Sequence, residues 1–337
     1  MSSRPLIAYL AAKGFEKDLL DELSLHGVHV RDVKERLVLA EGLFPSAWAQ
    51  NIWLEPFFQP ITSVGDAVRT LKSIQRNWKL HAVDFHRRAA LIEQQLPPVK
   101  SKPLPFGKAA PSSPLGSWTL WDHDTLLVSA KCSSAFPDGD VRFEEDRVNP
   151  PSRAYLKLWE TFTLFGCAPR PGELCLDLGS APGGWTWVIA GLGAKVFSID
   201  KSPLDSRVSA MPGVEHCLGS GFGLEPQTAG YVDWLFSDMA CYPERLLGAV
   251  KHWLDAGAVG NMVCTIKLQG ATDHHVVQAF REIPGSQVVH LSCNKHELTW
   301  VNFRRWRESS EAFAKACSAS VFGFQGGSPE GDEKAFP

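Results

Sequence analysis

A glycine-rich segment near the middle of the chain constrains the fold most strongly, because it joins an apolar run to a helical pattern. Glu173–Leu178 predicts a strand, the next residues include three glycines, and Trp185–Gly191 predicts a helix. Glycine lets the backbone turn tightly and approach a ligand with no Cβ in the way. The start of the helix adds free N–H donors. The segment therefore indicates a ligand-binding loop at the edge of an α/β sheet.

The spacing of these glycines bears on the kind of cofactor. Gly179, Gly183 and Gly184 form the pattern Gly-x-x-x-Gly-Gly, which differs from the Gly-x-Gly-x-x-Gly of dinucleotide-binding folds. Pro182 also stands where that fingerprint expects a free amide. The pattern favours a nucleotide-like cofactor other than NAD. Hydride transfer with NAD and a glycine-rich turn without a ligand are the alternatives.

Strand and helix patterns alternate from about Arg153 to Trp306. The expected strands are Glu173–Leu178, Lys195–Ile199, Val214–Cys217, Trp234–Ser237, Asn261–Ile266, Gln287–Leu291 and Leu298–Phe303, and helices are expected at Trp185–Gly191, Pro243–Leu254 and Asp273–Glu282. Such alternation predicts a mostly parallel sheet with helices on both faces. Ligands of these sheets bind at the carboxyl ends of the strands. This rule places Gly179, Asp200, Asp238 and Lys267 on one rim.

Polar residues at this rim are candidates for chemistry. Asp200 ends the strand that follows the loop, where a carboxylate can accept hydrogen bonds from both hydroxyls of a ribose, although a lone aspartate there is more often a cap or turn former. Asp238 and Lys267 each follow an apolar strand, and a lone lysine there would be a solvated surface residue. With Lys157 and Glu297 they make two lysines and two carboxylates, a convergence that indicates a reactive site.

The first half of the chain predicts a smaller α+β domain. Leu6–Ala11 and His29–Ala40 predict strands, Glu16–Leu25 and Val64–Gln75 predict helices, and this order is typical of a ferredoxin-like fold. Residues 96–116 are dense in Pro, Ser, Lys and Gly and predict a loop, followed by a hairpin around Asp122–Asp124. We expect domains at residues 1–150 and 151–306 and a disordered tail at 307–337.

Composition limits the partners. The chain has 337 residues, 44% hydrophobic and 21% charged, as in an ordinary globular protein, and its formal charge is −3. Any contact with RNA must then come from local basic patches. The eight cysteines contain no Cys-x-x-Cys pair, so no metal site is expected. The start lacks a signal-peptide pattern and no apolar run is long enough to span a membrane, so we expect a cytoplasmic protein.

The motifs together resemble one family. The segments Pro151–Leu158, Asp177–Trp185, Ser198–Asp200, Ser237–Met239, Ile266–Leu268 and Glu297–Trp300 are similar, in this order, to those of the FtsJ-type RNA 2′-O-methyltransferases. Within these, the chain is most similar to the family M methyltransferases, which modify a cytidine ribose in 23S large-subunit ribosomal RNA. The resemblance covers residues 151–306. The match before residue 151 is weak.

This resemblance implies a class I methyltransferase sheet whose last strand is antiparallel, with S-adenosylmethionine as cofactor and a ferredoxin-like and THUMP-type RNA-binding region, here shortened, before it. It implies a catalytic tetrad of Lys157, Asp238, Lys267 and Glu297. The residues expected to bind the cofactor are Asp177, Gly179, Ser180, Ala181, Pro182, Gly183, Gly184, Trp185, Asp200, Ser220 and Asp238. Ser220 stands where relatives have an aspartate that receives the adenine amino group. Ribosomal RNA or a ribosome assembly intermediate is the implied partner.

The mechanism that we expect is in-line transfer of a methyl group to a ribose 2′-hydroxyl. The hydroxyl is a poor nucleophile until its proton leaves, and Lys267 is the candidate base or, if it stays charged, the group that stabilises the alkoxide. Arg153, Arg304, Arg305 and Arg307 are either phosphate contacts or solvated surface. A methyltransferase acting on protein or a small molecule, and a non-catalytic RNA-binding module, are the other functions consistent with the sequence.

Overall fold

The computed structural model describes residues 4–99 and 101–306. The chain divides into two compact units, Met1–Pro105 with Ala110–Glu144 and Phe106–Ala109 with Glu145–Pro337. The tail expected at residues 307–337 and the candidate phosphate contact Arg307 lie outside the described residues.

The first unit begins with a four-stranded antiparallel sheet of order β2-β3-β1-β4. Its elements are β1 (Leu6–Ala11), α1 (Glu16–Leu25), β2 (His29–Lys34), β3 (Leu37–Glu41) and β4 (Ala49–Trp53). Central β1 is almost entirely buried, whereas β2 at the edge is largely exposed, as its polar sequence predicts. The strand order is that of a ferredoxin-like sheet, but a loop at residues 42–48 connects β3 to β4 where that fold has its second helix.

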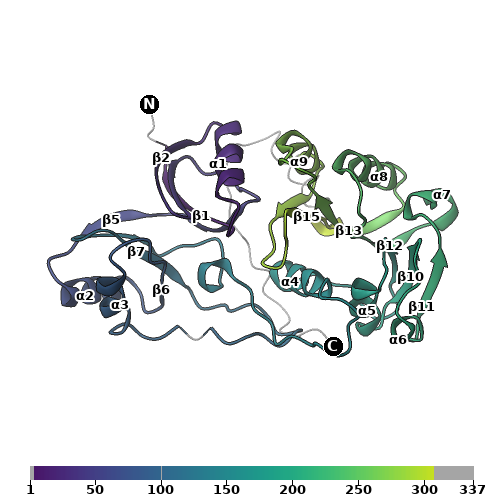
Figure 1. Ribbon diagram of the computed structural model, residues 1–337, viewed down its shortest axis with the longest axis horizontal. Coiled ribbons are helices and arrows are strands. Elements are labelled where there is room, and N and C mark those ends of the chain that lie inside the picture. The colour runs from purple at the N-terminus through teal and green to yellow at the C-terminus, as the bar shows by residue number, and fades with distance from the viewer. Residues whose placement is uncertain (1–3, 100, 307–337) are drawn as a thin grey trace. The chain divides into compact units, whose positions relative to one another are not determined.

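A second four-stranded sheet, of order β5-β8-β7-β6, completes this unit. Its elements are β5 (Phe57–Pro60), α2 (Val64–Ile74), β6 (Trp78–Leu80), α3 (His86–Glu93), β7 (Gly116–Asp122), β8 (Thr125–Ser129) and the 3-10 turn η1 (Pro137–Gly139). Leu71 of α2 and Ile92 of α3 share one buried core with Trp118 of β7. The helix predicted at Val64–Gln75 therefore exists, but it covers this second sheet (Figure 1).

The second unit is built on a seven-stranded sheet of order β11-β10-β9-β12-β13-β15-β14. The strands are β9 (Leu174–Leu178), β10 (Lys195–Asp200), β11 (Val214–Leu218), β12 (Val232–Ser237), β13 (Val259–Lys267), β14 (Ser286–Val289) and β15 (Glu297–Asn302). Only β15 runs against its neighbours, pairing antiparallel with both β13 and β14. The central strands are buried on both faces, which explains their continuous apolar runs. The predicted sheet and its antiparallel last strand are confirmed.

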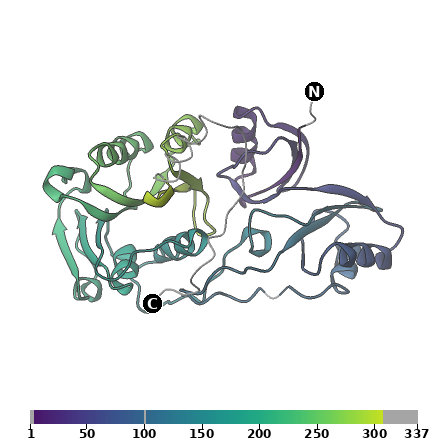
Figure 2. The ribbon, with the colours of Figure 1, turned by 180° about the vertical axis from the view of Figure 1, so that it is seen from behind.

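Helices cover both faces of this sheet. They are α4 (Tyr155–Phe165), α5 (Gly184–Gly191), α6 (Ser206–Ser209), α7 (Pro226–Ala229), α8 (Pro243–Asp255) and α9 (His274–Arg281), with the 3-10 turn η2 (Gly221–Gly223). Figure 1 shows α8 and α9 on one face and α4 and α5 on the other, and Figure 2 shows the same layers from behind. The α/β fold class is confirmed.

The strand register assembles one rim at the carboxyl ends of the parallel strands. Leu178 of β9 pairs with Ser237 of β12, so the residues that follow them, Gly179 and Asp238, begin their loops side by side. In the antiparallel pair, Lys267 at the end of β13 lies opposite Glu297 at the start of β15. Residues far apart in the sequence therefore meet here.

Among residues 4–99 and 101–306, no helix has the length and apolar character needed to cross a bilayer.

Candidate functional site

The glycine-rich loop packs tightly against the segment that follows β12. Gly179 has φ +79°, and a Cβ added there would lie 2.4 Å from Cγ of Met239. Gly183 has φ +110°, and a Cβ on Gly184 would lie 2.5 Å from Oγ of Ser152. A side chain at Gly179 would thus be both strained and obstructed. The glycines bring this loop close against its neighbours, and α5 begins at Gly184 directly after it.

Asp200 holds the loop to the end of β10. One carboxylate oxygen accepts a hydrogen bond from the amide of Ala181 at 3.1 Å, and the other accepts one from the amide of Ser202 at 2.9 Å. A carboxylate oxygen has two lone pairs, so each oxygen keeps acceptor capacity for a ligand hydroxyl. Asp200 is therefore a support of the loop as well as a candidate ribose ligand.

Asp177 lies beneath the loop, and its side chain supports the loop from inside. It is 1% exposed and accepts a hydrogen bond from the hydroxyl of Thr186 in α5 at 2.6 Å. Burial raises the pKa of Asp177 to about 7, and the negative charges of Asp238 and Asp200 add to the rise while Thr186 opposes it.

The variant Asp177→Asn should lose a pH dependence of stability. An unfolded aspartate has a pKa of about 3.9, whereas the folded value is about 7. The folded state thus binds more protons between these values, so the free energy of unfolding falls as pH rises through this window, by at most about 4 kcal/mol. We expect the variant to gain stability relative to the parent protein from pH 5 to pH 8 in denaturant unfolding. A stability difference that stays constant with pH would contradict this assignment.

Three other residues expected at the cofactor differ in their surroundings. Trp185 is buried, and its indole donates a hydrogen bond to the carbonyl of Ala154 at 3.0 Å, so its side chain anchors the start of α4. Ser180 is 5% exposed, and its hydroxyl has no hydrogen-bond partner among the described residues. Ser220 follows β11 and is exposed, with its carbonyl accepting from the amide of Gly223.

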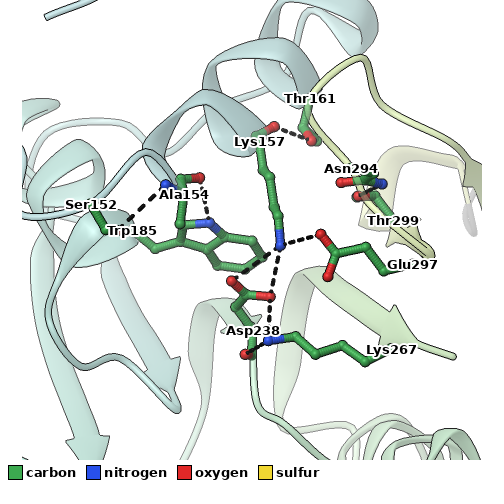
Figure 3. A network of polar contacts seen from close by, with 10 residues as sticks. All are labelled: Ser152, Ala154, Lys157, Thr161, Trp185, Asp238, Lys267, Asn294, Glu297 and Thr299. Carbon is green, nitrogen blue, oxygen red and sulfur yellow. Dashed lines mark hydrogen bonds and ion pairs between the residues drawn. The ribbon is translucent and has the colours of Figure 1, made fainter. Parts of the chain in front are cut away.

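The two lysines and two carboxylates of the expected tetrad come together at the rim (Figure 3). Nζ of Lys157 lies 3.1 and 3.3 Å from the carboxylate oxygens of Asp238 and 2.7 Å from Oε1 of Glu297. Nζ of Lys267 lies 3.1 Å from Oδ1 of Asp238 and donates to the main-chain carbonyl of Asp238 at 2.6 Å. One oxygen, Oδ1 of Asp238, therefore contacts Nζ of both lysines.

The two lysines differ in charge environment and exposure. Burial works to lower the pKa of Lys157, but the charges of Asp238 and Glu297 outweigh it, so the pKa is raised above its usual value. The Lys157 side chain is 10% exposed and its charge is fixed between two carboxylates. The Lys267 side chain is 28% exposed, and its Nζ contacts a carboxylate oxygen and the main-chain carbonyl of Asp238. Lys267 is thus the lysine that can meet a substrate.

A comparison with protein families matches residues 150–283 to the FtsJ-like methyltransferase family. This part of the chain is an FtsJ-like methyltransferase domain. The matched range contains Lys157, the glycine-rich loop, Asp238 and Lys267, and Glu297 follows it on β15.

Curated relatives also match the chain. Three proteins named ribosomal RNA large subunit methyltransferase M are similar to it. The one from Alkalilimnicola ehrlichii is 37% identical over 160 residues, 44% of each chain. The one from Thauera aminoaromatica is 34% identical over 171 residues, 49% of this chain and 46% of the relative. The one from Cellvibrio japonicus is 33% identical over 202 residues, 54% of this chain and 56% of the relative. The chain spans about half the length of the curated relatives that it matches.

The FtsJ-like domain contains a further buried carboxylate that the sequence analysis missed. Glu160 of α4 is 3% exposed and lies one turn after Lys157. Its carboxylate accepts hydrogen bonds from the amide of Ser292, at 2.8 and 3.0 Å, and from the hydroxyl of Ser292, at 2.9 Å. Ser292 belongs to the loop that leads to Glu297. The sequence carries no signal of this link, because Ser292 is distant from Glu160 in the chain.

Glu160→Gln should loosen this attachment. It keeps the size of the side chain but removes the charge that strengthens the hydrogen bonds from Ser292, so we expect a loss of about 1–3 kcal/mol in the free energy of unfolding. Ser292→Ala removes one of these hydrogen bonds and leaves the amide in place, so its loss should be smaller. Denaturant unfolding of both variants shows which of them loses more stability. Equal stability of Glu160→Gln and the parent protein would show that the loop is held by other contacts.

The arginines expected near substrate phosphates do not share one place. Arg304 and Arg305 follow β15, which starts at the tetrad and runs antiparallel to β13, so it ends at the other end of the strands. There the guanidinium of Arg304 lies 3.3 Å from the hydroxyl of Tyr231. The reversed direction of β15 therefore places these two arginines away from the rim. Arg153, at the start of α4, is exposed and pairs with Glu145 at 2.7 Å.

Proposed function

We propose that the chain is an S-adenosylmethionine-dependent methyltransferase that modifies a ribose 2′-hydroxyl of RNA, with a cytidine of 23S large-subunit ribosomal RNA, free or in an assembly intermediate, as target. The observation that carries the proposal is the cluster of Lys157, Asp238, Lys267 and Glu297 beside the glycine-rich loop. The names of the relatives support the ribosomal substrate, and the sequence resemblance supports the cytidine. Such a substrate would place the protein in the cytoplasm.

The residues around the loop fit the proposed cofactor. Ser180 contributes a buried hydroxyl with no partner among the described residues, and Asp200 keeps acceptor capacity for ribose hydroxyls. The close approach of Met239 to Gly179 leaves room only for backbone at that point. Gly179 to Gly184, Asp200 and Ser220 would hold S-adenosylmethionine, which supplies an activated methyl group on its sulfonium. Ser220, lacking a carboxylate, would contact the adenine through its hydroxyl or backbone.

Lys267 is the residue that we assign to the acceptor hydroxyl. A lysine nitrogen has three positions besides its carbon, and the carbonyl and carboxylate of Asp238 take two of them. No other contact within the described part of the chain takes the third position, which is left for the 2′-hydroxyl. We assign Lys267 as the base that takes the hydroxyl proton onto Nζ as the oxygen attacks.

The other three residues hold this geometry. Lys157 stays charged between Asp238 and Glu297, so it fixes both carboxylates and compensates their charge in a partly buried site. Asp238 orients Nζ of Lys267 through two contacts from one residue. A near-attack position of this kind lowers the barrier, because the reacting groups are already oriented.

The test is methylation of unmodified large-subunit ribosomal RNA with methyl-labelled S-adenosylmethionine. A 2′-O-methyl group blocks the attack of that hydroxyl on the next phosphodiester, so label should appear in dinucleotides that survive alkaline hydrolysis. Label in single nucleotides would place the methyl group on a base and contradict the ribose as acceptor. Label in protein or small molecules alone would exclude RNA.

Calorimetric titration with S-adenosylmethionine distinguishes the enzyme from a non-catalytic RNA-binding module. Saturable binding with one site per chain supports the enzyme. A chain that binds RNA but shows no heat with the cofactor would be the binding module.

A further inference from the structure

An exposed aromatic residue stands at the rim directly after the catalytic segment. Tyr242 is 65% exposed and lies four positions after Asp238, at the start of α8. Single exposed apolar side chains are common on protein surfaces and need no explanation. Tyr242 differs from such scattered residues in two ways. It lies between Asp238 of the tetrad and α8, and Arg245 lies one helical turn after it.

Arg245 accompanies Tyr242 on the first turn of α8. Its amide donates a hydrogen bond to the carbonyl of Tyr242 at 3.1 Å, so the two residues are one helical turn apart. The guanidinium of Arg245 lies over the ring of Phe222 at 3.9 Å, in a cation–π contact. This contact holds a planar cation in a defined place instead of leaving it to move through solvent.

Tyr242 and Arg245 stand on the side of the sheet where the tetrad lies. The segment that follows β12 runs from Asp238 through Cys241, which is buried, directly into α8. The exposed ring and the planar cation therefore lie at the rim, on the segment that follows the aspartate of the tetrad.

We propose that Tyr242 and Arg245 form a stacking platform for an RNA base adjacent to the methylated nucleotide. The proposal rests on the proposed function. A ribose that is brought to Nζ of Lys267 must leave its regular stack, and the neighbouring base then loses a stacking partner. Single-stranded RNA bases are bound by stacking on tyrosine rings and arginine planes, largely without regard to sequence. Such contacts also suit a protein of formal charge −3, because they do not depend on a strong positive field.

The experiment compares Tyr242→Ala, Tyr242→Phe and Tyr231→Ala in the full chain. Tyr231 is the matched control, since it is 51% exposed and lies just before β12, at the end of the strands opposite to the rim. Initial rates are measured with methyl-labelled S-adenosylmethionine and unmodified large-subunit ribosomal RNA. Tyr242→Ala should raise the KM for RNA about tenfold or more, with unchanged cofactor affinity by calorimetry. Tyr242→Phe keeps the ring and should stay within about twofold of the parent protein.

Two results would overturn the platform. One is a KM for Tyr242→Ala equal to that of Tyr231→Ala, and the other is a Tyr242→Phe variant as weak as Tyr242→Ala, which would assign the effect to the hydroxyl. Both are seen only when the parent protein methylates RNA. A parent protein that is inactive on RNA but binds cofactor would instead overturn the proposed function, so the two failures can be told apart.

Discussion

The variant Lys267→Arg should bind S-adenosylmethionine normally and transfer methyl groups about 10² to 10⁴ times more slowly than the parent protein. Arginine keeps the positive charge but does not lose its proton in a protein. Its planar guanidinium also cannot reproduce the two contacts that one tetrahedral nitrogen makes with Asp238. The rate is best measured in a single turnover with excess enzyme over RNA, so that product release does not hide the chemical step.

Lys251→Arg supplies the control for this experiment. Lys251 is exposed on α8, outside the tetrad, so the same exchange there should leave the rate unchanged. Calorimetry on both variants shows whether cofactor binding is intact. Substantial methylation by Lys267→Arg would remove the role of base and leave the lysine a purely electrostatic one, in which a fixed positive charge stabilises the developing alkoxide.

Gly179→Ala should weaken cofactor binding strongly and, with it, reduce activity. The added Cβ would lie 2.4 Å from Cγ and 3.0 Å from Cα of Met239. The backbone of Gly179 is also left-handed, which costs a residue with a side chain about 1–2 kcal/mol. Either the loop or the segment after Asp238 must move, so we expect the affinity for S-adenosylmethionine in calorimetry to fall at least about a hundredfold, a loss of about 2.7 kcal/mol.

Gly248→Ala is the matched control for this prediction. Gly248 lies within α8, and a Cβ there would meet nothing within 4 Å. Alanine is the better helix former, so this variant should bind the cofactor like the parent protein and unfold at a slightly higher temperature, by up to about 1 kcal/mol in stability. Normal binding by Gly179→Ala would mean that the loop can shift without loss, and the glycine would then serve the turn alone.

The sequence was most informative where local pattern and buried strands coincide. β9, β10, β12 and β13 were predicted to within about two residues, because apolar runs bounded by turn residues are typical of buried parallel strands. The rule that ligands bind at the carboxyl ends of such strands then indicated Gly179, Asp200, Asp238 and Lys267 without any coordinates.

The parts that the sequence did not reveal depend on tertiary contacts. No helix was predicted for α4, although it carries Lys157, because its residues Tyr155–Thr163 are all buried and no polar face marks a helical period. The role of Glu160 depends on Ser292, which is distant in the chain. In the first unit, β5 and β6 are too short to give a periodic signal, so the second sheet was missed.

The sharing of Oδ1 of Asp238 between two lysines has a consequence for substrate selection. Within the tetrad, the carboxylates of Asp238 and Glu297 offset whatever positive charge Lys157 and Lys267 carry. The catalytic centre therefore offers little long-range attraction to a polyanion. For the proposed RNA substrate, discrimination among molecules must then be made by surfaces that touch the strand. Exchanging a tetrad residue for a neutral one of similar shape should change turnover far more than it changes the salt dependence of RNA binding.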